Sequence, residues 1–434
     1  MVLESLVARR VSGLLARLAA VEPVIALHGP RSVGKSTVLR GLALEAGGSV
    51  LDLDDVDVRE AVAGNLAAVV ARATPLFVDE YQRVPDILDA IKARLNREGS
   101  LPGTAVITGS TRQDALPATA QALTGRLHSL TIWPLSQGEL AGVRENLLEG
   151  LARDPAAMVA QAPASTTTRA DYVERVCAGG LPLALRRTGA ARARWFDDFV
   201  RASIERDALE LSRIRERQAM ADLLAFLTAQ TGQLLNVSRA AEAIGVSRAT
   251  VEGHLRLLED LFLVVRLPAW GSTLRSRVSV KPKVHVVDSG LAARLLRLTP
   301  EKLAGLDPAA LTEFGHLLET FVVGEVRKQA SWLDEPVTLG HWRTSDGAEV
   351  DLVIEYDDGT VIAFEVKANE RATAPDFRGL TQLRDALGER FAAGIILTTG
   401  TRSFTYADRL HVMPIDRLWT PLTLQPVPES LPIS

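Results

Sequence analysis

The sequence predicts an α/β protein of several domains, with a parallel β-sheet in its N-terminal part. Two observations support this prediction. Over the first ~135 residues, short apolar runs alternate with helical patterns, which is typical of a parallel sheet covered by helices. The chain has 434 residues and exceeds the size at which one hydrophobic core stops growing, so about two to four domains are expected.

Composition, charge and cysteine content fit a soluble globular protein of the cytoplasm. Hydrophobic residues make up 47% of the chain, which is enough to form buried cores. The net charge of −4 argues against a surface covered with basic residues for nucleic acid, although a local basic face stays compatible with it. Cys177 is the only cysteine, so an intrachain disulfide is excluded. We expect no membrane partner, because no apolar run approaches the roughly 18 residues that span a bilayer.

Changes of pattern along the chain predict four units. They are residues 1–150 with the parallel sheet, a helical unit at 169–232, a winged helix-turn-helix at 233–269, and an α/β unit rich in strands at 270–434. Residues 1–20 are expected to form an amphipathic helix rather than a signal peptide. Residues 151–168, rich in Ala, Ser and Thr, are expected to form a flexible connection. The strands expected in the first unit are Val24–His28, Val50–Leu53, Leu76–Val78, Ala105–Thr108 and Leu130–Trp133.

A phosphate-binding loop is predicted directly after the first strand. The sequence from Gly29 to Ser36 fits Gly-x-x-x-x-Gly-Lys-Ser/Thr at every defined position and precedes a helical run, Thr37–Leu44. In such a loop, backbone N–H groups point at the phosphates of ATP, Lys35 neutralises the β and γ oxygens, and the Ser36 hydroxyl ligates Mg²⁺. The candidate nucleotide-binding residues here are Gly29, Pro30, Arg31, Ser32, Val33, Gly34, Lys35, Ser36 and Thr37.

Polar residues at the ends of two further strands predict the rest of a hydrolytic site. Leu76–Val78 is followed by Asp79, a candidate ligand of Mg²⁺ through water, and Glu80, a candidate general base for the attacking water. The strand Ala105–Thr108 brings Thr108 and Ser110 to the same edge of the sheet, where they could sense the γ-phosphate. The sequence therefore predicts ATP hydrolysis rather than nucleotide binding alone.

Two further features resemble the AAA+ ATPases. Arg126 precedes the last strand of the sheet, and the resemblance implies that it is an arginine finger acting on a neighbouring subunit of a homo-oligomeric ring, with a hexamer as one candidate. The alternative for Arg126 is a surface ion pair. Gly179–Leu183 resembles the Gly-x-Pro element of the helical lid in signalling and archaeal-type ATPases, which implies that Pro182 packs on the nucleotide. Ordinary turn chemistry explains this element equally well.

A helix-turn-helix pattern spans Leu235–Leu258, with Ser247 as the predicted cap of its second helix. In a DNA-binding version, the residues that face the groove would be Ser247, Arg248, Thr250 and His254, with Phe262–Leu267 as a wing. The acidic Glu252 on the same helix counts against DNA, since phosphate contacts require Lys and Arg. A purely structural winged helix stays as the alternative.

Three carboxylates and a lysine are expected to converge in the last unit. They are Glu319 on a helical run, Asp351 on a strand, and Glu365 and Lys367 on one face of the next strand. Such an arrangement could hold a divalent metal through Asp351 and Glu365, with Lys367 stabilising developing negative charge. It resembles the PD-(D/E)xK nuclease pattern, except that no Pro precedes Asp351. A plain ion-pair cluster without cleavage is the alternative.

Taken along its whole length, the chain resembles bacterial AAA+ ATPases that carry a C-terminal domain of unknown function related to restriction endonucleases. Further carriers of this resemblance are Asp79–Gln82, Trp133–Ser136, Ile204–Asp207, Lys283–Leu291 and Glu365–Lys367. The resemblance implies an oligomeric, Mg²⁺-dependent ATPase that acts on DNA through the winged-helix and nuclease-like units. A nucleotide-gated scaffold or remodeller of a protein partner, without nuclease activity, is the alternative.

Overall fold

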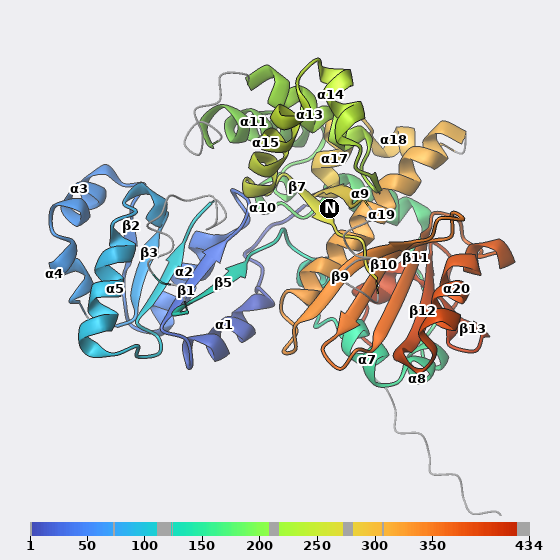
Figure 1. Ribbon diagram of the computed structural model, residues 1–434, viewed down its shortest axis with the longest axis horizontal. Helices are drawn as coiled ribbons and strands as arrows, with labels where there is room; N and C mark the ends of the chain where they lie inside the picture. The colour runs from blue at the N-terminus through green and yellow to red at the C-terminus, as the bar shows by residue number, and fades with distance from the viewer. Residues whose placement is uncertain are drawn as a thin grey trace, which may run out of the picture.

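Three β-sheets organise the described part of the chain in a computed structural model, which describes residues 2–72, 74–110, 123, 125–207, 217–271, 281–305 and 308–422. Figure 1 shows a parallel sheet at one end of the molecule and a six-stranded sheet at the other, with a layer of helices along the upper edge of the view. A small three-stranded sheet belongs to this helical layer. In the described residues, no helix is both long and apolar enough to cross a membrane.

The N-terminal sheet is parallel and has the strand order β2-β3-β4-β1-β5. Its strands are β1 (Val24–His28), β2 (Val50–Asp52), β3 (Leu76–Asp79), β4 (Ala105–Thr108) and β5 (Leu127–Thr131). The helices in this region are α1 (Val11–Ala19), α2 (Lys35–Glu45), α3 (Val56–Gly64), α4 (Leu66–Val70), α5 (Ile87–Glu98) and α6 (Gln137–Ala141). The predicted bounds of β1 and β4 are confirmed, whereas β5 begins three residues earlier than Leu130.

The helical layer contains a pair of helices joined by a short turn. Its elements are α9 (Arg169–Ala178), α10 (Pro182–Leu185), α11 (Gly189–Ala202), α13 (Arg217–Ala229), α14 (Val237–Ile244), α15 (Arg248–Asp260), α17 (Ser289–Leu295) and α18 (Pro300–Leu303). Ser247 caps α15 by accepting a hydrogen bond from the Thr250 backbone N–H at 3.1 Å, as predicted. Three antiparallel strands in the order β6-β8-β7 accompany the pair: β6 (Gln233–Leu234), β7 (Val264–Leu267) and β8 (Lys283–Val286).

The C-terminal unit is a mixed sheet in the order β13-β14-β12-β11-β10-β9, flanked by a long helix, α19 (Pro308–Ala330). Strand β11 pairs parallel with β12 and antiparallel with β10. The remaining elements of this unit are β9 (Val337–Arg343), β10 (Glu349–Tyr356), β11 (Val361–Lys367), α20 (Arg378–Leu387), β12 (Phe391–Thr398), β13 (Phe404–Ala407) and β14 (Leu410–Pro414).

The prediction of a flexible connection over residues 151–168 is wrong for its first part. Residues 151–160 contain the end of α7 (Leu147–Arg153) and all of α8 (Pro155–Ala160). Asp154 caps α8 by accepting from the Ala157 N–H at 2.9 Å, and the two helices pack on β12, β13 and β14 of the C-terminal sheet. Leu151, Met158 and Val159 are the buried residues of this part, whereas residues 161–168 form no helix or strand. The predicted N-terminal helix is also shorter than expected, because only Val11–Ala19 is helical.

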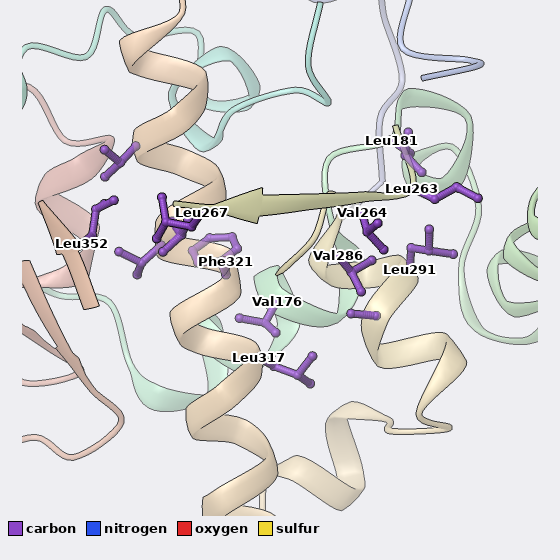
Figure 2. Packing of buried hydrophobic residues seen from close by; sticks show 14 of the residues in the cluster. Val176, Leu181, Leu263, Val264, Leu267, Val286, Leu291, Leu317, Phe321 and Leu352 are labelled. Carbon is purple, nitrogen blue, oxygen red and sulfur yellow. The ribbon is translucent and has the colours of Figure 1, made fainter. Parts of the chain in front are cut away.

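One hydrophobic core joins the helical layer to the C-terminal unit. Figure 2 shows Val176 of α9, Val286 of β8 and Phe321 of α19 together in this core. Leu352 of β10 belongs to the same cluster, so α19 is packed against both units. Movement of one unit against the other would expose apolar surface, which is unfavourable at roughly 25 cal/mol per Å².

Candidate functional site

The phosphate-binding loop has the backbone that its two glycines permit. Gly29 has a φ of 149°, and a Cβ at this position would lie 2.2 Å from the Ile132 carbonyl oxygen, so a larger residue would displace the loop. Gly34 has a φ of 97° and directly precedes α2, whose first residues are Lys35, Ser36 and Thr37. The loop therefore delivers its backbone N–H groups at the N-terminus of a helix, which favours bound anions.

Lys35 is held within the loop itself. Its side chain is buried, and its Nζ donates hydrogen bonds at 2.9 Å to the carbonyl oxygens of Gly29 and Pro30. Phosphate oxygens would compete for the same ammonium, because a charge-assisted hydrogen bond to an anion is stronger than one to a neutral carbonyl. The position of the Lys35 ammonium group therefore fits a cation that binds the phosphates of a nucleotide.

Asp79 and Glu80 stand at the end of β3, as the sequence predicted. Asp79 is buried and accepts a hydrogen bond from the Thr108 hydroxyl, and the Thr108 hydroxyl oxygen in turn accepts from the Glu80 N–H at 3.3 Å. Gln82 Nε2 donates to the Glu80 carboxylate and, at 3.1 Å, to Ser110 Oγ. The four predicted residues Asp79, Glu80, Thr108 and Ser110 thus form one hydrogen-bonded group, to which the structure adds Gln82.

His28 and Tyr81 form a buried support beneath this group. His28 Nε2 lies 3.2 Å from the Tyr81 hydroxyl, and its Nδ1 lies 3.3 Å from Ser129 Oγ, so one imidazole bridges β1, β5 and the residue after Glu80. Burial, with a smaller contribution from the charge of Lys35, lowers the pKa of His28 to about 4. The imidazole is therefore neutral at pH 7. Sequence reasoning missed this pair because each residue alone reads as an ordinary core position.

A pocket of about 420 Å³ lies over the loop. It is lined by residues 31–37, by Glu80, and by Pro182 and Leu183 at the start of α10. Pro182, which the lid resemblance implied to pack on the nucleotide, therefore lines the same pocket as the loop. The volume is within the range of small-molecule and cofactor sites.

The N-terminal segment before α1 forms another wall of this pocket, which the sequence did not predict. Leu3, Leu6 and Val7 line the pocket, and the Leu3 N–H donates to the Leu185 carbonyl at 2.9 Å. Arg9 donates to the Val33 carbonyl of the loop at 2.7 Å. The segment therefore ties the phosphate-binding loop to α10.

The oxygen ligands that Ser36 and Asp79 offer fit Mg²⁺. The Ser36 hydroxyl lines the pocket, and the Asp79 carboxylate lies at the end of β3 next to Glu80, which also lines it. Carboxylate and hydroxyl oxygens are the ligands that Mg²⁺ prefers. Bound with ATP, the ion would neutralise charge on the phosphates, and Ser36 and Asp79 are the residues that would hold it.

Arg126 lies outside the pocket of its own chain. It is half-buried, and its Nη1 donates to Asn96 Oδ1 of α5 at 2.6 Å. The residues that the sequence placed in a helix before it, 111–122, lie outside the described residues. The position is compatible with action on a second subunit.

The predicted DNA-facing residues are divided between surface and core. Ser247 and Arg248 are exposed and Thr250 is half-buried, but His254 is only 6% exposed. The prediction that His254 faces a groove is therefore wrong, because helical periodicity turns it into the core beside Val251. The face that α15 does expose carries Arg248, Glu252 and Arg256.

The C-terminal carboxylates converge as expected, but around a lysine that the sequence analysis did not single out. Lys283 Nζ lies 2.8 Å from Glu319, 2.8 Å from Asp351 and 2.7 Å from Glu349. We call Lys283, Glu319, Glu349 and Asp351 the Lys283 cluster. Lys367 pairs with Glu365 at 2.8 Å, and the Asp351 N–H donates to Glu365 at 3.3 Å.

Burial and charge set the protonation states in and beside the Lys283 cluster. Burial alone would lower the pKa of Lys283, but the charges of the three carboxylates hold it above its usual value. Burial raises the pKa of Asp351, and the neighbouring Lys283 charge outweighs this effect, so the net pKa is lowered. Burial, together with the Asp351 charge, raises the pKa of Glu365 to about 8. Lys283 is therefore a full cation at pH 7.

Comparison with known families divides the chain in the same way as the structure. Residues 21–141 match the family described as AAA domain. Residues 169–302 and 314–418 match two families described as domains of unknown function, DUF8612 and DUF4143. The chain is 26% identical over 399 residues to the uncharacterized proteins Rv2008c of Mycobacterium tuberculosis and Mb2031c of Mycobacterium bovis, a match that spans 92% of this chain and 81% of each relative.

Solved structures also resemble the chain. The Walker-type ATPase paby2304 of Pyrococcus abyssi has a TM-score of 0.41 and 16% identity, over 66% of this chain and 94% of that chain. The Holliday junction branch migration motor RuvB of Thermotoga maritima has a TM-score of 0.31 and 17% identity, over 68% of this chain and 96% of that chain.

The N-terminal domain is an AAA-type P-loop ATPase domain. This follows from the loop between β1 and α2, the parallel sheet, and the match of residues 21–141. The two regions that follow it match families without a described function, so the matches assign no activity to them.

Proposed function

We propose that this protein is an oligomeric, Mg²⁺-dependent ATPase whose nucleotide state moves the helical lid and drives work on DNA. The observation that carries the proposal is the pocket itself: the loop, Glu80 and Pro182 line one cavity, although they come from three separate parts of the chain. ATP in this cavity would contact the phosphate-binding loop and α10 at once, and hydrolysis would change the contact between them.

Each residue has a defined part in the proposed reaction. Lys35 and the N–H groups of the loop bind the β- and γ-phosphates, with Mg²⁺ held by Ser36 and Asp79. Glu80 accepts a proton from the attacking water, and Gln82 holds its carboxylate in place. Thr108 and Ser110 fix the end of β4 against Asp79 and Gln82.

Hydrolysis is tested by ATP turnover of the purified full-length chain with and without Mg²⁺. Wild type is expected to release phosphate only with Mg²⁺. Lys35→Ala is expected to lose at least about 100-fold in turnover, because it removes the cation of the loop from the phosphates. Turnover of Lys35→Ala at the wild-type rate would contradict the site.

Action on DNA is supported by the exposed face of α15. Arg248 and Arg256 on this face, together with Arg266 and Lys281, line a hollow of about 280 Å³ between α15 and the strands β7 and β8. Phosphate contacts by such residues weaken steeply with salt, because binding releases counterions from DNA. DNA is therefore expected to raise ATP turnover at low salt and to lose this effect at high salt.

Remodelling of a protein partner is the second candidate. Glu252 lies between Arg248 and Arg256 on the same face, and Arg266 is paired with Glu259 at 2.6 Å, so the net positive charge there is small. The matched pair Arg248→Ala and Glu252→Gln separates the two functions. A DNA-binding face predicts weaker DNA binding in the first variant and stronger binding in the second, whereas equal affinities in both would favour the protein partner.

A further inference from the structure

The Lys283 cluster surrounds one ammonium group with carboxylates from two elements. Glu319 comes from α19, and Glu349 and Asp351 come from β10, all within 2.8 Å of Lys283 Nζ. Proteins bind hard divalent cations by surrounding the ion with several carboxylate oxygens. In this cluster, the Lys283 ammonium group takes the place of such an ion.

Lys283 reaches this position from outside the six-stranded sheet. It is the first residue of β8, the central strand of the three-stranded sheet, and it pairs with Leu234 of β6 and Leu267 of β7. All four residues of β8 are buried, and Lys283 is 2% exposed. Its backbone is therefore held on both sides, and its side chain is almost completely shielded from solvent.

The core fixes the strand still further. Val284 and Val286 of β8 belong to the same hydrophobic cluster as Phe321 of α19, and Figure 2 shows Val286 and Phe321 in that cluster. Phe321 lies two residues after Glu319 on the same helix. Withdrawal of Lys283 would thus disrupt the packing between β8 and α19 as well as three ion pairs.

We infer that Lys283 permanently occupies the cation position of a former metal site, so that the C-terminal unit keeps the carboxylates of a metal-dependent nuclease and cuts no DNA. In this arrangement the ion pairs of the cluster connect β8 to α19 and to β10. In the described ranges, no group of three or more His, Cys, Asp or Glu is arranged to hold a metal ion. The inference does not depend on ATP hydrolysis, which occurs at a separate site.

The sharpest test is a Mn²⁺ titration of the nucleotide-free full-length chain, followed by electron paramagnetic resonance. Wild type is expected to show no Mn²⁺ site that depends on Asp351. Lys283→Ala vacates the centre of the cluster, so it is expected to gain one Mn²⁺ per chain, bound at least 10-fold more tightly than any site of wild type. Adding Asp351→Asn to Lys283→Ala should remove this gain.

Lys302→Ala is the control, since Lys302 is an exposed lysine of α18 outside the Lys283 cluster. It is expected to behave as wild type. Thermal unfolding provides a second readout: Mn²⁺ should raise the Tm of Lys283→Ala and leave that of wild type unchanged. If Lys283→Ala does not fold, Lys283→Met, which keeps the volume of the side chain, takes its place in both measurements.

Two results would overturn the inference. One is an Asp351-dependent Mn²⁺ site, or Mn²⁺-dependent DNA cleavage that is lost in Asp351→Ala, in wild type with Lys283 in place. The other is a folded Lys283 variant that binds Mn²⁺ no more tightly than wild type.

Discussion

Gln82 Nε2 donates a hydrogen bond to the carboxylate of Glu80, two residues before it in the chain. The same nitrogen also donates to Ser110 Oγ at 3.1 Å. Glu80 has a left-handed backbone conformation, with a φ of 54°, which is uncommon for a residue other than glycine. The side chain that accepts the proton from water in our proposal is therefore oriented by a neighbour rather than by its own backbone alone.

We predict that Gln82→Leu, which keeps the size of the side chain and removes its amide, lowers kcat for ATP about 10-fold and changes the Kd for ATP less than 2-fold. Gln82→Glu removes the amide donor and places a second carboxylate beside Glu80, so it should lower kcat at least as much as Gln82→Leu. Steady-state kinetics and ATP titrations check both variants. A wild-type kcat in both variants would contradict a role for Gln82 in orienting Glu80.

Arg126→Ala is expected to bind ATP almost normally and to lose hydrolysis. If Arg126 acts on a neighbouring subunit, mixing this variant with Lys35→Ala should restore part of the activity, because the mixed interface contains one intact loop and one intact Arg126. Asn96→Ala is the control: it removes the partner of Arg126 within the chain and should leave turnover near wild type. No recovery in a mixture that co-assembles by native mass spectrometry would assign Arg126 a structural role.

Protonation of His28 should destabilise the fold. Its pKa is about 4 in the folded chain and near its ordinary value of 6.5 in the unfolded chain. Between these values the unfolded chain binds a proton that the folded chain does not, so stability falls as the pH drops from 6.5 towards 4. At pH 4.5 this difference in proton binding lowers the free energy of unfolding by roughly 2–3 kcal/mol relative to pH 7. Guanidinium unfolding of wild type and His28→Gln at pH 7 and 4.5 should show a smaller loss in the variant.

Cys177 should be unreactive in the folded chain. Burial, helped by the charges of Glu174 and Glu301, raises the pKa of its thiol to about 12, and only the thiolate attacks thiol reagents. Reaction with a chromogenic disulfide at pH 8 is expected to be at least about 100-fold slower in the native chain than in guanidinium. Because Cys177 is the only cysteine, the unfolded sample gives one thiol per chain. Equal rates in both samples would contradict the burial of this side chain.

Much of the nucleotide site could be predicted from the sequence, because its residues are adjacent in the chain. The loop from Gly29 to Ser36 and the pair Asp79 and Glu80 carry their own strand and helix signals. Arg9 could not be predicted in this way. Its contact with Val33 joins residues 24 positions apart, and no local pattern marks it.

The contacts of the Lys283 cluster could not be predicted either, because they join residues even further apart in the chain. Lys283 lies in the part of the chain that the sequence predicted to be rich in strands, but nothing local indicates that it meets carboxylates 36 and 68 residues further along the chain. Similarly, α8 resembles a linker until the C-terminal sheet is known, because only Met158 and Val159 of this short helix are buried. Tertiary packing, not propensity, decides both cases.

The most direct test of the proposed ATPase compares ATP binding and single-turnover hydrolysis in wild type and Glu80→Gln, both with Mg²⁺. The amide keeps the shape of the side chain and removes the base, so the variant should bind ATP with a Kd within about 2-fold of wild type and hydrolyse it at least about 100-fold more slowly. Equal single-turnover rates in the two proteins would contradict the assignment of Glu80 as the base.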